Sequence, residues 1–103
     1  DEQYDAVETV TGTERGAIEL AQLLFRRSSW SEIASALKDL DANGEQPEGL
    51  RRMILAYCWR ILVGGGKQAN RAFEIIETFA ENVIDSEKAG LAAMCYEVHK
   101  QVK

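Results

Sequence analysis

The sequence predicts an all-α protein, a compact bundle of about five helices. Apolar residues recur at spacings of three and four along most of the chain, which is the period of a helix buried on one face. No stretch alternates apolar and polar residues for long enough to form a convincing strand. The 103 residues include one proline and eight glycines, so we expect short connections and no long linkers.

The first two helices are predicted by their apolar stripes and by signals at their ends. A helix over 13–27 has Thr13 as its candidate N-cap and ends in two arginines, which suit the negative end of a helix dipole. A helix over 30–40 follows it. Ser29 and Glu32 fit a capping box at the start of this second helix.

Three more helices are predicted after a polar break. Pro47 suits the first turn of a helix over 47–63, because its missing N–H costs nothing there. Beyond a glycine triplet, an apolar stripe predicts a fourth helix over 67–83. Asp85 or Ser86 is the candidate cap of a fifth helix that continues close to the C-terminus.

These helices are expected to form one domain over 13–103, after a lead-in over 1–12 in which residues 3–9 have room for a short helical turn. The chain lacks an initiator methionine, so we expect a fragment or processed product with more sequence upstream.

The acidic N-terminus is unlike a secretory signal, and no apolar run approaches the roughly 20 residues of a membrane span. We therefore expect a cytoplasmic protein without a membrane partner. Its net charge of −5 argues against non-specific binding of nucleic acid.

The stretch VGGGKQAN at 63–70 combines glycines and a lysine as phosphate-binding loops do. Such a loop needs a glycine five residues before its last glycine and a Ser or Thr after the lysine, but Ile61 and Gln68 stand there. A predicted helix, not a strand, leads into the stretch. We interpret it as the turn between the third and fourth helices, with Gly64 in the left-handed conformation that ends a helix.

Residues 39–44, DLDANG, match the opening of a calcium-binding loop. The twelfth position of that loop should be a bidentate glutamate, and here it is Leu50, which the third helix needs for its core. We interpret the segment as a polar connection between helices. A small enzyme or metal-regulated module built on this segment is the last-ranked hypothesis.

Residues able to perform chemistry are few and scattered. His99 is the only histidine, and its polar neighbours predict a solvated side chain. Cys58 and Cys95 lie in apolar patterns, so we expect two buried, reduced thiols, with a disulfide as the minority interpretation. One histidine and two separated cysteines are too few for a zinc site without several carboxylates. No catalytic residue, metal ligand or cofactor is assigned, and this segment is not expected to be an enzyme.

Basic residues gather in the middle of the chain, and three of them (Arg60, Lys67 and Arg71) are expected at one end of the bundle, around the glycine turn. Two interpretations stay open: a solvated face, or a docking patch for an acidic partner or a DNA backbone. The full set is Arg26, Arg27, Arg51, Arg52, Arg60, Lys67 and Arg71.

The order of helices and turns carries a resemblance to a known family. A short helix (SSWSEIASALKDLDANG) leads into a Gly-x-x-Pro turn and a long amphipathic helix (NGEQPEGLRRMILAYCWRILV), and two further helices follow (ANRAFEIIETFAENVIDSEKAGLAAMCYEV). This order, with the entry TVTGTERGAIELAQLLF, resembles the C-terminal helical collar of clamp-loader AAA+ ATPases. That group includes the bacterial gamma/tau subunits, the small subunits of replication factor C and the phage clamp loaders.

The resemblance implies an oligomerisation domain that acts in DNA replication. Collar domains hold neighbouring subunits side by side in a ring, while other domains bind the sliding clamp and DNA. The family's ATPase motifs are absent from this chain, so ATP and magnesium would belong to a module upstream. The alternative is a stand-alone helical adaptor or regulatory domain that binds a partner's helix in an apolar groove.

Candidate interface residues come from the aromatic content. The third predicted helix is apolar on more than one side, which indicates a central helix or one that is partly an interface. Tyr57 and Trp59 point about 200° apart on this helix. Because Trp, Tyr and Arg dominate interface hot spots, we select Tyr57, Trp59, Arg60 and Trp30 as the candidate interface.

Overall fold

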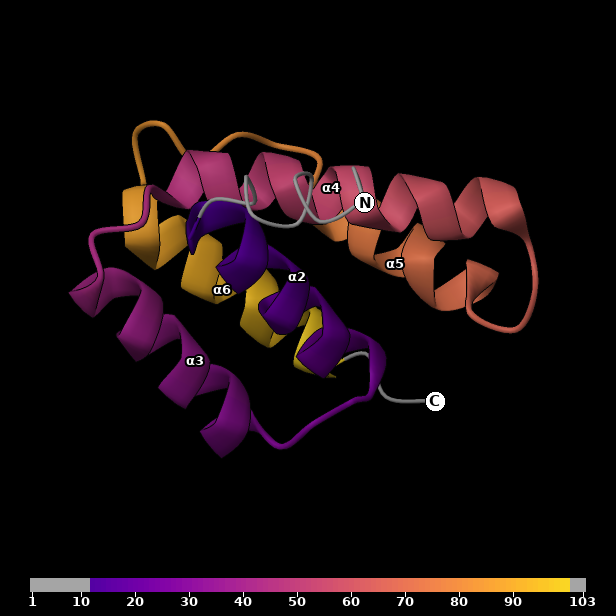
Figure 1. The fold of residues 1–103 in the computed structure, drawn as a ribbon, viewed down its shortest axis with the longest axis horizontal. Coiled ribbons are helices and arrows are strands. Elements are labelled where there is room, and N and C mark those ends of the chain that lie inside the picture. The colour runs from indigo at the N-terminus through magenta and orange to yellow at the C-terminus, as the bar shows by residue number, and fades with distance from the viewer. Residues whose placement is uncertain (1–11, 101–103) are drawn as a thin grey trace, which may run out of the picture.

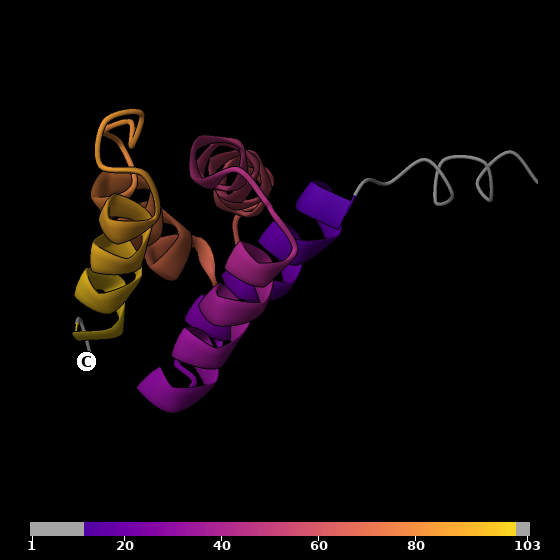
Figure 2. The same cartoon turned by 90° about the vertical axis from the view of Figure 1, so that its left-hand side faces the viewer.

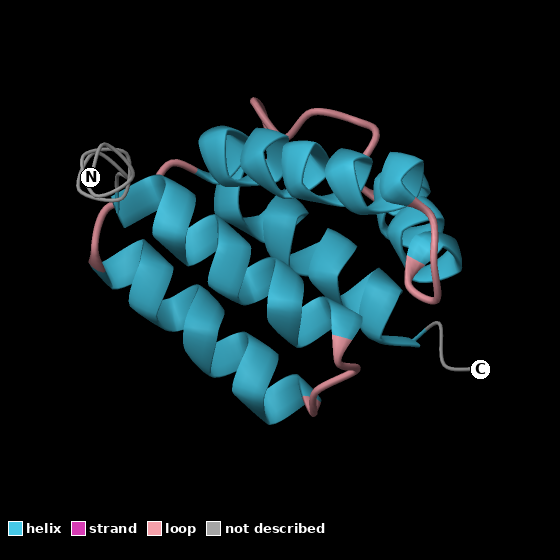
Figure 3. Ribbon diagram, turned by 45° about the vertical axis from the view of Figure 1, so that its right-hand side comes forward, coloured by secondary structure: helices cyan, strands magenta, loops and turns pink. Residues whose placement is uncertain are grey.

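The computed structural model describes residues 12–100, which fold into five α-helices joined by short loops (Figures 1 and 3). In the numbering of Figure 1 they are α2 (Gly12–Phe25), α3 (Trp30–Ala42), α4 (Pro47–Gly64), α5 (Ala69–Thr78) and α6 (Glu87–Lys100). This part of the chain contains no strand. The predicted all-α bundle of about five helices is therefore confirmed. Residues 1–11, which hold almost all of the predicted lead-in, lie outside the described part.

The helices form two pairs that α4 connects. Figure 2 shows α2 and α3 on one side, α5 and α6 on the other, and α4 across the top between them. The most extensive packing of α4 is against α2 and α5, while α3 also contacts α6 across the bundle. None of these five helices is long and apolar enough to cross a membrane.

One hydrophobic core lies between the two pairs and beneath α4. Every helix contributes its apolar stripe, so the burial of these stripes is the main source of stability. The most deeply buried large side chains are Leu20, Leu24, Ile33, Leu50, Ile54, Ile75, Phe79, Val83 and Val98.

The first two helices end as local rules predict. The Ser29 side chain accepts a hydrogen bond from the Glu32 amide at 3.2 Å, which confirms the predicted cap of α3. Both α2 and α3 end in paired backbone bonds that reach back three and five residues, with a left-handed residue in the turn. That residue is Gly44 after α3 (φ 79°) and Arg27 after α2 (φ 58°). Arg27 therefore adopts a backbone conformation that glycine adopts more easily.

Several predicted boundaries differ from the structure: α2 ends at Phe25 and not at 27, α3 continues to Ala42, and α5 begins at Ala69 and not at 67. Three other differences bear on the caps and turns. Helix α2 begins at Gly12, so Thr13 lies within the first turn and is not its cap. Helix α4 includes Gly64, and the positive φ values fall on Gly65 (75°) and Gly66 (97°) instead. Helix α5 stops at Thr78, five residues before the predicted end. It stops there because Arg51 of α4 binds the carbonyl groups that follow Thr78.

Candidate protein-interaction surface

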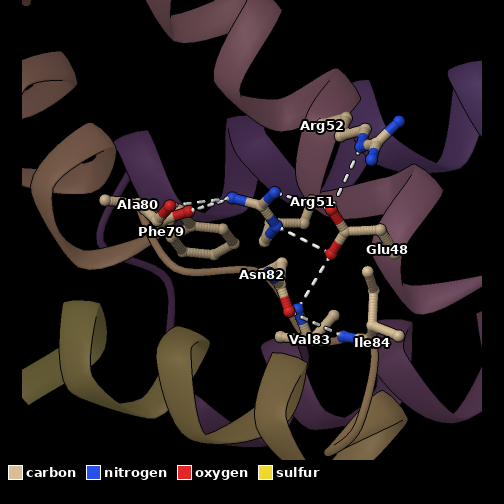
Figure 4. A network of polar contacts seen from close by, with 8 residues as sticks. All are labelled: Glu48, Arg51, Arg52, Phe79, Ala80, Asn82, Val83 and Ile84. Carbon is tan, nitrogen blue, oxygen red and sulfur yellow. Dashed lines mark hydrogen bonds and ion pairs between the residues drawn. The ribbon is translucent and has the colours of Figure 1, made fainter.

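A buried arginine of α4 binds the carbonyl groups at the end of α5. The Arg51 guanidinium donates to the carbonyl oxygens of Phe79 at 2.6 Å and Ala80 at 3.3 Å (Figure 4). Arg51 is only 8% exposed. The last carbonyl groups of a helix have no partner within the helix, so this guanidinium takes the place that a further helical turn would fill. The helix consequently ends where the arginine lies, and the chain turns away.

Glu48 completes this network from the first turn of α4. Its carboxylate accepts from Arg51 at 2.6 and 2.9 Å, from Arg52 Nε at 3.0 Å, and from the Val83 amide at 2.8 Å (Figure 4). The Arg51 hydrogen bond is the largest cause that lowers the pKa of Glu48, from 4.5 to about 2, and the Val83 amide adds to it. The network holds the connection between α5 and α6 against the start of α4.

Arg71, like Arg51, is a buried arginine that donates hydrogen bonds to carbonyl groups near helix ends, at another corner of the bundle. It is 4% exposed and donates to the Leu24 carbonyl oxygen, near the end of α2, from Nε at 3.2 Å and from a terminal nitrogen at 3.0 Å. It also reaches the Val98 carbonyl of α6 at 3.4 Å and the Glu74 carboxylate at 3.1 Å. One guanidinium thus joins the ends of two helices.

These contacts correct the prediction made for the basic cluster. Arg51 and Arg71 belong neither to a solvated face nor to a docking patch, because both are buried and hydrogen-bonded inside the bundle. The sequence does hold a signal for this. Arg51 lies three residues before Ile54, and Arg71 lies four before Ile75, so each arginine falls on its helix's core-facing side.

The outward side of α4 carries large apolar residues that nothing covers in the described part of the chain. Trp59 is 59% exposed and Val63 is 62% exposed. With the exposed Arg52 and Ala56 they follow one line along the helix, at spacings of four, three and four residues. We call these four residues the α4 outer stripe. Arg60 borders it, exposed and without an ion-pair partner among the described residues.

The four predicted interface residues do not share one surface. Trp59 and Arg60 lie on the outer side of α4, but Tyr57 is half-buried and packs edge-on against Phe25 of α2, with 5.9 Å between ring centroids. Trp30 begins α3 and packs edge-on against Tyr96 of α6, with 5.0 Å between centroids. Tyr57 therefore helps to hold α4 on α2, while Trp30 belongs to a separate aromatic cluster.

That second cluster includes the histidine. The His99 ring lies 5.8 Å from the Trp30 ring and 6.0 Å from the Tyr96 ring, measured between centroids, and the residue is half-buried. The prediction of a solvated histidine was wrong, because α3 packs against α6 at this point and covers one side of the ring.

An apolar pocket of about 400 Å³ opens between α3, α4 and α6. Asp41 and Lys88 form an ion pair at 3.3 Å and both contribute to its lining. Its apolar lining is formed mainly by Leu37, Leu40, Pro47, Leu50, Leu91 and Ala92. This volume lies within the range of about 300–1,000 Å³ that is typical of ligand pockets, which are lined mainly by apolar side chains.

The segments that resemble ligand loops have structural roles. Asp39 and Asp41 lie within α3, and Gly44 ends it. No group of three or more His, Cys, Asp or Glu side chains within residues 12–100 is placed to hold a metal ion. Gly65 and Gly66 lie in the turn between α4 and α5, as the interpretation of 63–70 stated, while Gly64 is the last residue of α4.

Both cysteines are buried and free. Burial raises the pKa of Cys58 and of Cys95 to about 12, so neither thiol ionises near neutral pH. The expectation of two buried, reduced thiols is confirmed.

Comparisons with protein-family models, with curated proteins and with solved structures find no match to this chain.

Proposed function

We propose that this chain is an assembly module whose α4 outer stripe packs against a neighbouring subunit. The observation that carries the proposal is the 59% exposed tryptophan beside the 62% exposed Val63, both on a helix whose other side is firmly packed. Large apolar residues clustered on one exposed face are typical of interaction sites, and Trp and Arg are among the residue types enriched at hot spots.

The internal arginine contacts support this role. A domain that joins subunits has to present its surface without deforming, and Arg51 and Arg71 tie the ends of three helices to the rest of the bundle. The stripe itself uses none of the core residues. Binding there would leave the packing of the bundle unchanged.

The collar resemblance supplies the biological setting of the proposal. The chain would be the oligomerisation domain of a clamp-loader-like AAA+ ATPase in the cytoplasm, acting in DNA replication without catalysis of its own. ATP and magnesium would bind upstream, and DNA and the sliding clamp would be contacted by other domains.

The test uses the natural full-length product. We expect it to hydrolyse ATP faster with primed DNA, and to lose both ring assembly and this stimulation in Trp59→Arg. Phe73→Ala, which removes a 49% exposed aromatic of α5, is the control and should change neither. A full-length product without ATPase activity would refute the clamp-loader setting.

The pocket between α3 and α6 favours a second candidate function, a helical adaptor that takes an apolar side chain of a partner. Ala92→Trp should fill the pocket and abolish partner capture in cross-linking experiments, while Trp59→Ala should not. The opposite pattern would assign the capture to α4 and remove the adaptor hypothesis.

A further inference from the structure

The α4 outer stripe is patterned like one side of a two-helix seam. Its 4-3-4 spacing is the alternation that keeps residues in line along a packed helix pair. It places the small Ala56 one turn before the large Trp59. A helix that fits this order needs a small residue opposite Trp59 and a large one opposite Ala56, because facing layers interdigitate when large meets small.

An antiparallel copy of α4 supplies that order. With a two-fold axis between residues 57 and 58, Trp59 of each copy lies opposite Ala56 of the other, and Arg52 lies opposite Val63. Helix α4 has no basic residue in its last turn. In this pairing the guanidinium of Arg52 from one copy would lie at the negative end of the other copy's α4, where a cation is favoured.

The charges beside the stripe favour the same orientation. The loop between α5 and α6 and the first residue of α6 expose three carboxylates, and the loop also exposes Ile84, which is 59% exposed. The Glu48–Val83 hydrogen bond holds this loop beside the start of α4. Antiparallel pairing brings the loop of one copy to the far end of the other copy's α4, where Arg60 and Lys67 are exposed. Opposite charges then meet across the contact. The carboxylates are Glu81 and Asp85 of the loop and Glu87 at the start of α6.

A parallel arrangement of the two α4 helices has neither the large-to-small packing nor the opposite charges of the antiparallel pair. It places Trp59 against Trp59 and Ala56 against Ala56, and it brings the two acidic loops to the same end of the pair. Bulk and charge would both be mismatched.

We propose that the α4 outer stripe binds a second copy of this chain, as an antiparallel α4–α4 pair related by a two-fold axis. This inference rests on one part of the proposed function, the use of the stripe as the assembly surface, and it names the occupant. A two-fold pair closes on itself, so it takes the place of a head-to-tail ring contact through the same stripe. A contact between single helices is small, so the pair should form with micromolar affinity.

Sedimentation of the 103-residue chain over a range of concentrations tests the pairing. We expect a monomer–dimer equilibrium that Trp59→Ala weakens at least tenfold, while Phe73→Ala, at a 49% exposed aromatic of α5, leaves it unchanged. Both residues are exposed, so circular dichroism should show that both variants fold. A chain that stays monomeric at millimolar concentration overturns the proposal, as does a dimer that is insensitive to the Trp59 change.

Cross-links test the contact and its orientation. The two copies of residue 56 lie close together in either orientation, so Ala56→Cys should give a covalent dimer with a short bis-maleimide if α4 is the contact. Ala93→Cys, at an exposed position of α6, is the matched control and should not. The native cysteines are buried and should not react. Equal cross-linking of the two variants would overturn the pairing through α4.

A mixture of Arg52→Cys and Val63→Cys chains reads the orientation. The antiparallel pair should cross-link one variant to the other, whereas a parallel pair would cross-link each variant to itself and would overturn the antiparallel pairing.

These outcomes are independent of the test of the proposed function. A monomeric chain removes the second copy as occupant and leaves a different subunit as the neighbour. The ATPase and ring assembly of the full-length product decide the wider role by themselves.

Discussion

Arg51 and Arg71 occupy positions on α4 and α5 that the helical period assigns to the core. Each is buried because helix ends arrive with carbonyl groups that need donors, and a guanidinium offers several donors in a fixed plane. The hydrogen bonds are what make burial of these charges acceptable. Glu48 neutralises Arg51 from the same helix, three residues away.

Replacing Arg51 should therefore destabilise the fold strongly. We expect Arg51→Met to lower the free energy of unfolding by about 2–4 kcal/mol, since the Phe79 carbonyl and the Glu48 carboxylate lose a charged donor. Arg52→Met is the adjacent control: its side chain is 70% exposed, and the expected loss is below about 1 kcal/mol. Urea unfolding measures both. Equal losses in the two variants would contradict the role assigned to Arg51.

The low pKa of Glu48 predicts a pH dependence with a definite sign. The carboxyl group has a pKa of about 2 in the folded protein and an ordinary value of 4.5. The folded state thus binds fewer protons, and the stabilisation is fully present above pH 4.5 and is lost as the pH falls from 4.5 toward 2. In Glu48→Gln this part of the acid sensitivity should disappear. The Tm of the unmodified protein and of Glu48→Gln should be measured between pH 2 and pH 6. Parallel curves of Tm against pH would contradict the prediction.

At the scale of elements, the fourth predicted helix shows how tertiary contacts override a local period. The apolar spacing continues to Val83, but α5 ends at Thr78 because Arg51 binds the carbonyls that follow it. The Val83 side chain is still buried, so its apolar character was a signal of the core and not of a longer helix.

The glycine triplet gives a prediction at the same scale. Gly64 is helical and a β-carbon there would meet nothing within 4 Å, so Gly64→Ala should stabilise the protein by about 0.5–1 kcal/mol. Gly65 has φ 75° and ψ −169°, a region open almost only to glycine, so Gly65→Ala should cost about 1–3 kcal/mol. Thermal unfolding of the two variants separates these effects. The reverse order would restore the original assignment of the left-handed residue to Gly64.

At the scale of the whole molecule, α4 separates an inner surface that holds the bundle together from an outer surface that the bundle does not use. Tyr57 contacts Phe25 on the inner side, and Trp59 is exposed on the outer side. Self-association through the outer side would leave the core unchanged.

The closed core predicts how the thiols react. Cys58 and Cys95 are buried, and their raised pKa keeps them protonated, so a thiol reagent should modify them only when the protein unfolds. We expect modification at neutral pH to be slow in the native protein and to accelerate in urea in step with the loss of helical signal. Rapid modification of either cysteine in native buffer would show that the core opens locally.

The sequence by itself determined the features that depend on neighbours a few residues away. These are the helical period, the Ser29 cap, the start of α4 at Pro47 and the failure of residues 63–70 to match a phosphate loop. Each of them needs only the spacing of nearby residues, which a single chain displays. The candidate site was predicted in part, since Trp59 and Arg60 are on the outer surface and Tyr57 and Trp30 are packed elsewhere.

Only the tertiary structure decided the rest, because the partners are distant along the chain. Arg51 meets a carbonyl group 28 residues away, and Arg71 meets one 47 residues away. A helical wheel places Tyr57 and Trp59 on different sides of α4, but it does not say which side faces α2. That choice follows from the packing of α2 and α5 on α4, which buries one side and leaves Trp59 and Val63 uncovered.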